Sequence, residues 1–233
     1  MAAALLSVVQ HCSADYLGLM EDHLEGRNIR FSYHRPFTED GKLPHRDSIG
    51  EGLILLGGGP WGSAGGRDVP TLDEEVRLAR ACLMLDIPVI GIGLGAQILA
   101  LAADGHSVAA ETAFTISQAR RTTPDALNGH LPETYPNIIY MRDRPVPPDY
   151  ATTLAVDETG HPALFQIGDN ALGFTGHPGF KSAMAEDLVM EFEESPSNAT
   201  ANLGRSRDMR VSIEDALVRI MTGVTTLTGW MER

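Results

Sequence analysis

The sequence predicts an α/β fold, in which a central, mostly parallel sheet carries helices on both faces and a helical extension follows at the C-terminal end. Apolar segments of strand length alternate with segments of helical periodicity through the first hundred residues. Short connections between such segments are typical of parallel sheets that are covered on both faces. Glycine-rich turns follow two of the strands, at residues 57–62 and 91–95, and ligands bind at that edge of such sheets.

The first half of the chain alternates between expected strands and expected helices. The strands, which are short and rich in apolar residues, are Leu5 to Gln10, Ile29 to Tyr33, Leu53 to Leu56 and Ile87 to Ile90. Residues 13 to 15, Ser-Ala-Asp, predict the N-terminal cap of a helix that continues to Glu25 and stops at Gly26. Apolar residues at helical spacing predict a second helix over Leu72 to Leu85.

The second half of the chain has shorter strands that are separated by turn residues. These strands, which we expect to form hairpins that extend the sheet, are Phe114 to Ser117, Ile138 to Met141, Thr152 to Val156, Ala163 to Ile167 and Ala171 to Thr175. A helix is expected over Ser182 to Glu194, followed by a loop rich in serine, asparagine and arginine. Ser212 and Asp215 resemble a capping box at the start of a last amphipathic helix.

Length and composition favour one large domain of an ordinary soluble protein. The chain has 233 residues, of which 43% are hydrophobic and 21% are charged. Its net charge of -13 disfavours nucleic acid and anionic membrane surfaces as partners. We expect a domain over residues 1–194 and an extension of loop and helix over residues 195–233.

The cysteine content and the first residues favour a cytoplasmic protein. Cys12 and Cys82 are too few for a disulfide framework in a chain of this size, and free thiols fit a reducing compartment. The first residues lack the basic region of an export signal, and their apolar run is too short to span a membrane. We expect no metal and no cofactor.

The stretch IPVIGIGLGAQILA, from Ile87 to Ala100, predicts a tight turn from a buried strand into a helix. Many α/β enzymes hold a nucleophile at the tip of such an elbow, under the partial positive charge of the helix N-terminus. The residue at this tip is Gly93, which has no side chain. The elbow geometry is therefore expected without its usual nucleophile.

Three motifs together resemble the class I glutamine amidotransferases, a family whose domain has a flavodoxin-like α/β fold. They are LILLGGGPWG at 53–62, PVIGIGLGAQILA at 88–100 and ALGFTGHPG at 171–179. They occur in the order and at the spacing of that family, and the resemblance covers residues 5 to 194. It implies the same fold for this domain.

The resemblance also implies where a catalytic triad would lie. Active members of the family use a cysteine in a Gly-x-Cys-x-Gly elbow, and a histidine and a glutamate from a His-Pro-Glu segment. These positions correspond to Gly93, His177 and Gly179, so two of the three catalytic side chains are missing. Cys12 and Cys82 are expected to be small buried residues rather than displaced nucleophiles. We therefore expect no catalytic residues and no appreciable glutaminase activity.

A pocket is expected to remain at this edge of the sheet. Two of its expected lining residues, Gly58 and Gly59, belong to the glycine-rich turn at 57–62, which we call the glycine loop. The others are Leu94 and Gln97, from the helix that follows the elbow, and His177. His177 is either a ligand contact or a histidine whose hydrogen bonds are made to the backbone at a strand end, and the second interpretation is favoured. Trp61 and Trp230 are candidates for an interface. Trp61 is equally suited to cap the core, and Trp230 to pin the last helix onto its own domain.

The first functional hypothesis is a catalytically inactive amidotransferase-like protein that acts as a structural or regulatory subunit. Domains of this family usually work docked to a larger enzyme, so a larger enzyme subunit is the expected protein partner. The remaining pocket would take a small glutamine-like ligand. Residues 195–233 would then be the added docking element. The resemblance extends to proteins that occur beside bacterial enzymes of amine metabolism, so we expect a complex of amine or nitrogen metabolism.

Two alternatives remain open from the residues alone. A hydrolase or transferase acting on a glutamine-like or γ-glutamyl compound would use His177 as a base, with Asp143 as a second polar group nearby. The competing interpretation of Asp143 is a solvent-facing residue paired with Arg142 or Arg144. A dinucleotide-binding protein is the lesser alternative, because residues 91–96 match G-x-G-x-x-A and Glu111 follows about 20 residues later.

Overall fold

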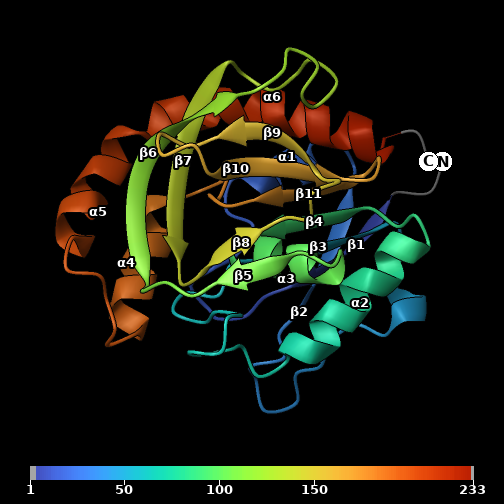
Figure 1. Ribbon diagram of the computed structural model, residues 1–233, viewed down its shortest axis with the longest axis horizontal. Coiled ribbons are helices and arrows are strands. Elements are labelled where there is room, and N and C mark those ends of the chain that lie inside the picture. The colour runs from blue at the N-terminus through green and yellow to red at the C-terminus, as the bar shows by residue number, and fades with distance from the viewer. Residues whose placement is uncertain (1–3, 232–233) are drawn as a thin grey trace.

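The computed structural model describes residues 4–231, and its centre is a nine-stranded sheet (Figure 1). Its strands, in chain order, are β1 (Leu5–Val9), β2 (Arg30–His34), β3 (Gly52–Leu55), β4 (Val89–Ile92), β6 (Ala113–Arg121), β7 (Thr134–Met141), β9 (Thr152–Val156), β10 (Pro162–Ile167) and β11 (Ala171–Phe174). Their order across the sheet is β2-β1-β3-β4-β11-β10-β9-β6-β7. A separate two-stranded sheet, which the sequence did not predict, joins β5 (His106–Val108) to β8 (Arg144–Val146).

The sheet has a parallel half and an antiparallel half. Strands β2, β1, β3, β4 and β11 pair in parallel. From β11 to β7 every pairing is antiparallel. Strand β11 was expected only in a hairpin, but it also pairs in parallel with β4. It therefore joins the two halves and places the segment after Phe174 beside the elbow.

Helices cover both faces of the sheet, which confirms the predicted α/β fold. The helices are α1 (Met20–Glu25), α2 (Leu72–Met84), α3 (Leu94–Ala102), α4 (Ser182–Glu191), α5 (Ala199–Asp208) and α6 (Arg210–Thr228), with a short 3-10 helix η1 (Arg46–Ser48). Strand β3 shows the two faces clearly. Leu53 and Leu55 belong to the core under α2 and α3, whereas Ile54 belongs to the core under α1 and α6. Side chains alternate across a strand, so a strand covered on both faces is apolar throughout.

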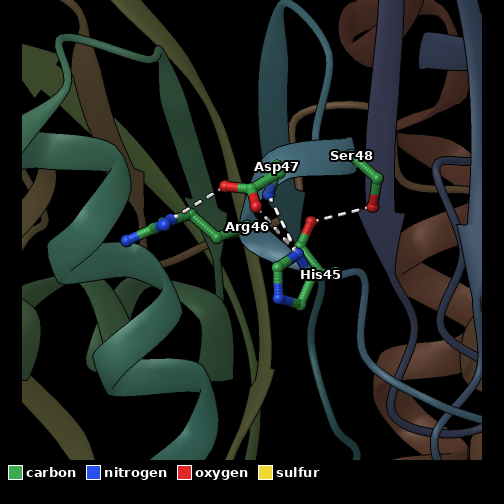
Figure 2. A network of polar contacts seen from close by, with 4 residues as sticks. All are labelled: His45, Arg46, Asp47 and Ser48. Atoms are coloured by element: carbon green, nitrogen blue, oxygen red, sulfur yellow. Dashed lines mark hydrogen bonds and ion pairs between the residues drawn. The ribbon is translucent and has the colours of Figure 1, made fainter.

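The polar loop between β2 and β3 is closed by local hydrogen bonds, shown in Figure 2. His45 precedes η1, and its Nδ1 accepts a hydrogen bond from the Asp47 amide at 3.3 Å. The Ser48 hydroxyl donates to the His45 carbonyl oxygen at 2.8 Å. The side chains of His45 and Asp47 are largely exposed. These contacts therefore form a surface turn.

The helix expected from residue 13 begins only at Met20. Residues 11 to 19 instead form an irregular segment, which we call the β1–α1 loop. Gly18 has a φ of +63°, a left-handed conformation that ends any helix approaching from the N-terminal side. The helix-cap prediction for Ser13, Ala14 and Asp15 was therefore wrong, and the loop packs against the elbow region instead.

The loop expected after Ser195 is largely helical, because it contains α5. Asn198 and Asn202 both donate side-chain hydrogen bonds to the carbonyl oxygen of Phe114, which lies near the start of β6. These tertiary contacts favour a helix where composition suggested a loop. Helix α6 begins at Arg210, so Ser212 lies inside it and the expected capping box was wrong. In Figure 1 this helix, drawn in red, runs across the upper part of the view.

Trp230 lies in the core of its own chain, with a relative exposure of 2%. Its Nε1–H donates to the Glu51 carbonyl oxygen at 3.0 Å, and its ring lies against Gly52, where a Cβ atom would come within 2.8 Å of it. The candidate role of Trp230 in an interface is thereby corrected, and Trp230 pins the end of α6 to β3. Among residues 4–231, no helix combines the length and hydropathy needed to cross a bilayer.

We predict that Trp230→Ala lowers the free energy of unfolding by about 3–5 kcal/mol, because it leaves a large cavity and an unpaired carbonyl group. Urea unfolding followed by circular dichroism measures the change. Trp61→Ala is the matched control, since Trp61 is only half-buried and its loss should cost less. A smaller loss for Trp230→Ala than for Trp61→Ala would contradict the assignment of Trp230 to the core.

Candidate functional site

The elbow between β4 and α3 has a positive φ at its tip. Gly93 has a φ of +56° and a ψ of -113°, a conformation that residues with a side chain rarely adopt. Its amide donates to the Phe174 carbonyl oxygen at 2.8 Å, which ties the tip to β11. A Cβ atom added at Gly93 would meet only the Gly57 Cα, at an ordinary contact distance of 3.4 Å. The elbow therefore has room for a small side chain.

His177 follows β11 and is held by backbone groups at both ring nitrogens. Its Nε2 donates to the Tyr16 carbonyl oxygen at 2.8 Å, and its Nδ1 accepts the Gly179 amide at 3.1 Å. Burial lowers the pKa of His177 to about 4, so the ring is neutral near pH 7. The favoured interpretation of His177, a histidine satisfied by the backbone, agrees with this geometry. Neither nitrogen is free to act as a base.

Packing closes position 179, which the sequence resemblance matches to the glutamate of the family. A Cβ atom at Gly179 would come within 2.7 Å of Met20 Cγ, 2.8 Å of the Met20 amide nitrogen and 2.9 Å of the Leu17 carbonyl oxygen. The Gly179 carbonyl oxygen accepts the Leu19 amide at 2.8 Å. A glutamate at position 179 would thus have to displace the backbone of the β1–α1 loop.

Asp143 is buried and binds backbone amides rather than His177. Its carboxylate accepts hydrogen bonds from the amides of Ser63 at 2.9 Å, Ala64 at 3.0 Å and Ala110 at 3.1 Å. The interpretation of Asp143 as a solvent-facing residue was therefore wrong, and neither Asp143 nor His177 has the other among its hydrogen-bond partners. Asp143 anchors the segment that follows the glycine loop.

The other expected pocket residues brace the glycine loop. Gln97 donates from Nε2 to the Arg142 carbonyl oxygen at 2.7 Å and accepts the Ser63 hydroxyl at Oε1. The Leu94 side chain lies where a Cβ atom at Gly58 would project, and Gly59 is covered by side chains of α4 and of the residue after it. These residues support the loop from outside the cavity described next.

A small cavity of about 20 Å³ lies beneath the elbow. Its lining residues are Asp15, Gly57, Ile92, Gly93, Ile138, Tyr140, Thr175, His177, Phe180, Met184 and Leu188. A volume of this size holds about one water molecule. Of the residues singled out from the motifs, Gly93 and His177 reach this cavity. The space for a larger ligand is filled by apolar side chains, including those of α4.

The polar group that sequence reasoning missed is the carboxyl of Asp15. Asp15 Oδ2 lies so close over Gly57 that a Cβ atom there would be 2.0 Å away, and Oδ1 has no hydrogen-bond partner. Burial raises the pKa of Asp15 to about 7, although nearby His11 opposes the rise. The sequence offered only a helix-cap pattern at Asp15, because nothing in it showed that Gly18 would break the helix.

A second buried polar pair fixes the start of the glycine loop. His11 Nδ1 lies 3.0 Å from the Gly57 carbonyl oxygen, and His11 Nε2 lies 2.7 Å from Glu75 Oε2. Burial lowers the pKa of His11, but the charge and hydrogen bond of Glu75 outweigh burial and raise it overall. With acceptors at both nitrogens, His11 is an imidazolium paired with a carboxylate. The pair holds the Gly57 carbonyl in place.

Neither cysteine supplies a replacement nucleophile. Cys12 and Cys82 are buried, as expected, and burial raises the pKa of both thiols. The reactive form of cysteine is the thiolate, which a raised pKa disfavours. Trp61 is half-buried at the end of the glycine loop, with the Arg67 guanidinium 4.9 Å from its ring centre. Its proposed place in an interface stays a prediction.

We predict that the stability of Asp15→Asn, measured relative to wild type, increases as the pH rises from 4 to 8. The folded state keeps the Asp15 proton up to about pH 7, whereas the unfolded chain loses it near 3.8, so wild-type stability falls across this range. At about 1.4 kcal/mol per pKa unit, the difference reaches roughly 4 kcal/mol. The lowered pKa of His177 makes the stability rise with pH in part of this range. This contribution is the same in wild type and in Asp15→Asn, so it cancels in their difference.

Urea unfolding of both proteins at several pH values measures this difference. Asp47→Asn is the control, because the Asp47 side chain is exposed. A difference between wild type and Asp15→Asn that is independent of pH would contradict the buried, proton-binding state of Asp15.

No protein-family model and no curated protein matches the chain. Solved structures with a similar fold do exist. A glutamine amidotransferase from Thermotoga maritima is 19% identical, with a TM-score of 0.76 over 98% of this chain and 99% of that chain. A glutamine amidotransferase from Methylobacillus flagellatus is 20% identical, with a TM-score of 0.71 over 99% and 92%.

A third similar structure is that of a candidate GMP synthase subunit from Thermoplasma acidophilum. It is 18% identical, with a TM-score of 0.57 over 90% of this chain and 98% of that chain. Identities this low relate the folds alone. The chain therefore has the flavodoxin-like α/β fold of glutamine amidotransferases.

Proposed function

We propose that this protein is a glutamine amidotransferase-like subunit without glutaminase activity, with a structural or regulatory role in a larger bacterial enzyme complex. The observation that carries the proposal is the closed position at Gly179, together with the missing side chain at Gly93. A thiol-dependent amidase needs a nucleophile, a free imidazole nitrogen and a group that orients the imidazole. Without the nucleophile, only binding and backbone stabilisation remain, a loss of several orders of magnitude.

The state of His177 supports the same conclusion. In an active triad the imidazole takes and returns a proton, which requires a ring nitrogen that faces the reacting atoms. Here both nitrogens bond to backbone groups, at Tyr16 and Gly179. The hydrolase alternative that relies on His177 and Asp143 is not favoured, because Asp143 binds three amides elsewhere.

The dinucleotide alternative is not favoured either. The fingerprint normally follows the first strand of its domain, whereas here it follows β4, in the middle of the sheet. Glu111 is exposed in the segment between β5 and β6.

The role as a subunit draws on the fold and on the C-terminal extension. One similar structure is that of a candidate GMP synthase subunit. In the extension at 195–233, α6 exposes Val211 and Val218, which are seven residues apart and so lie on one face of the helix. We propose this extension as the docking element, with Trp61 as a further contact. The partner is a larger enzyme of amine or nitrogen metabolism.

We predict that Gly93→Cys folds but releases no ammonia from glutamine at an amidotransferase-like rate. The cost in stability is on the order of 1–3 kcal/mol, because a residue with a side chain must adopt the positive φ. Activity stays absent because His177 is occupied and the carboxylate is missing. Unfolding in urea and an ammonia-release assay measure both quantities, with Gly93→Ala as the matched control. Ammonia release by Gly93→Cys alone would contradict the proposed loss of the proton-transfer machinery.

We predict that Gly179→Glu, in contrast, lowers the stability far more than Gly93→Ala does. The added side chain meets backbone atoms of Met20 and Leu17 rather than open space. Urea unfolding of both variants tests this difference, and equal losses would show that the β1–α1 loop moves aside easily.

Affinity capture of the tagged protein from its native cell, followed by native mass spectrometry, tests the role as a subunit. The expected result is a stoichiometric complex with a larger enzyme. The double variant Val211→Glu and Val218→Glu should release that enzyme while leaving the fold intact, and Met84→Glu, at an exposed residue of α2, is the control. A wild-type protein that returns alone would overturn the proposal.

A further inference from the structure

A cavity of about 500 Å³ lies where the start of α4 meets the junction of α5 and α6, the helices drawn in orange to red in Figure 1. We call it the α4–α6 cavity. Ligand pockets in proteins typically measure about 300–1,000 Å³, so this cavity has room for a small organic molecule. Within residues 4–231, Phe180 is the one lining residue that it shares with the small cavity beneath the elbow. The two are therefore separate spaces.

Apolar side chains form one part of the lining of the α4–α6 cavity. Phe180 and Ile213 are buried, each with a relative exposure of 4%, and belong to the same core cluster. Leu19, from the β1–α1 loop, is half-buried and packs against that cluster. An aromatic ring or another flat apolar group is stabilised when it covers such side chains. The lining therefore favours a ligand with an apolar body.

Basic side chains form another part of the lining. Lys181, Arg207 and Arg210 lie around the cavity, together with one acidic residue, Glu214. The chain has a net charge of -13, so its overall field repels anions. An anion is attracted only where basic side chains gather locally, and three of them gather here. The cavity therefore favours a ligand that is anionic as well as apolar.

These basic side chains have donors to spare. Arg207 donates from Nε and Nη2 to Glu186 Oε1, at 3.2 and 2.7 Å, and Arg210 donates from Nε to Glu214 Oε1 at 2.8 Å. Within residues 4–231, Nη1 of Arg207 and both Nη atoms of Arg210 donate to no protein acceptor. Both ion pairs are exposed, and exposed pairs contribute little to stability, so an anionic ligand competes with them readily.

Lys181 is the basic residue here without a carboxylate partner in the part of the chain that the structure describes. It is half-buried, and its Nζ lies 6.0 Å from the centre of the Tyr16 ring. Its charge is therefore not neutralised by the protein.

The number and shape of the basic groups favour a phosphate over a carboxylate. A phosphate monoester carries a charge of about -1.5 to -2 at pH 7 and presents three acceptor oxygens. The planar guanidinium group matches phosphate geometry and binds two of these oxygens at once. Two guanidinium groups and one ammonium group therefore suit a phosphate better than the single charge of a carboxylate.

We propose that the α4–α6 cavity is a binding site for a small organic phosphate monoester with a flat ring as its body. The phosphate binds Lys181, Arg207 and Arg210, and the ring lies against Phe180 and Ile213. The site goes beyond the proposed function, because it requires neither glutaminase chemistry nor a partner enzyme. Its ligand contacts α4 on one side and the extension at 195–233 on the other.

Isothermal titration of the full chain at pH 7 with phenyl phosphate tests the ligand class. Phenyl phosphate should bind at one site. Inorganic phosphate, which lacks the ring, and benzoate, which carries a single charge, should each bind about tenfold more weakly or worse. Phenol should not bind. No saturable binding of phenyl phosphate, or equal affinity for phenyl phosphate and inorganic phosphate, would overturn the proposal. Equal affinity for benzoate would overturn the assignment to phosphates.

Lys181→Gln and Arg210→Gln test the place of binding. Each removes one charged donor and should weaken the binding of phenyl phosphate by about tenfold. Arg46→Gln is the matched control, because Arg46 lines a different, more open cavity of about 860 Å³ that also contains Lys42 and Arg77. Circular dichroism verifies that all three variants fold.

Arg210→Lys separates charge from shape at the same position. It keeps the positive charge but loses the planar fork, so its affinity should lie between those of wild type and Arg210→Gln. Wild-type affinity in both Lys181→Gln and Arg210→Gln, or a loss in Arg46→Gln as large as theirs, would place the phosphate elsewhere and overturn the proposal.

The outcome is independent of the test for a partner enzyme. Binding of phenyl phosphate by a protein that is captured alone would uphold this site and reject the role as a subunit. Capture of a larger enzyme by a protein that does not bind phenyl phosphate would do the reverse.

Discussion

The close contact between the β1–α1 loop and the segment after β11 is the constraint on which the rest of the site depends. Gly18 and Gly179 approach so closely that a Cβ atom at Gly18 would lie 2.1 Å from the Gly179 carbonyl oxygen. The same contact gives His177 its backbone acceptor at Tyr16 and carries Asp15 under the elbow. This one backbone contact thus provides a hydrogen-bond acceptor for His177 and leaves no space for a carboxylate at position 179. It also places the carboxyl group of Asp15 at the wall of the cavity.

Two neighbouring sets of buried ionisable groups, the His11–Glu75 pair and Asp15, differ in their hydrogen bonding. The His11 and Glu75 pair neutralises itself and binds the Gly57 carbonyl, so it serves the backbone of the glycine loop. Asp15 has no such partner, and its high pKa is the cost of burying a lone carboxyl. The two buried carboxyl groups therefore differ in whether a charged partner accompanies them into the core.

The sequence predicted the parallel half of the fold well, because buried strands and glycine-rich turns leave strong local patterns. It predicted the elbow at Gly93 for the same reason, and it favoured a backbone-bound His177 because both of the expected catalytic partners are glycines. It missed Asp15 and misplaced Asp143, since the partners of both are distant in the chain, at Gly57 for the first and at Ser63 and Ala110 for the second. It also missed α5, whose helix depends on asparagine contacts with β6 that composition does not reveal.

Gly93 and Gly179, the two positions that the sequence resemblance matches to catalytic residues, differ in the space around them. At Gly93 the backbone has a positive φ and the space for a Cβ atom is open, so a cysteine there would need no rearrangement of its neighbours. At Gly179 the neighbouring loop has filled the space that a side chain would need. A chain with cysteine at position 93 would still have to rearrange the β1–α1 loop before a glutamate fitted at position 179. A side chain at position 93 therefore depends on that position alone, whereas a side chain at position 179 depends on the conformation of a loop that is distant in the chain.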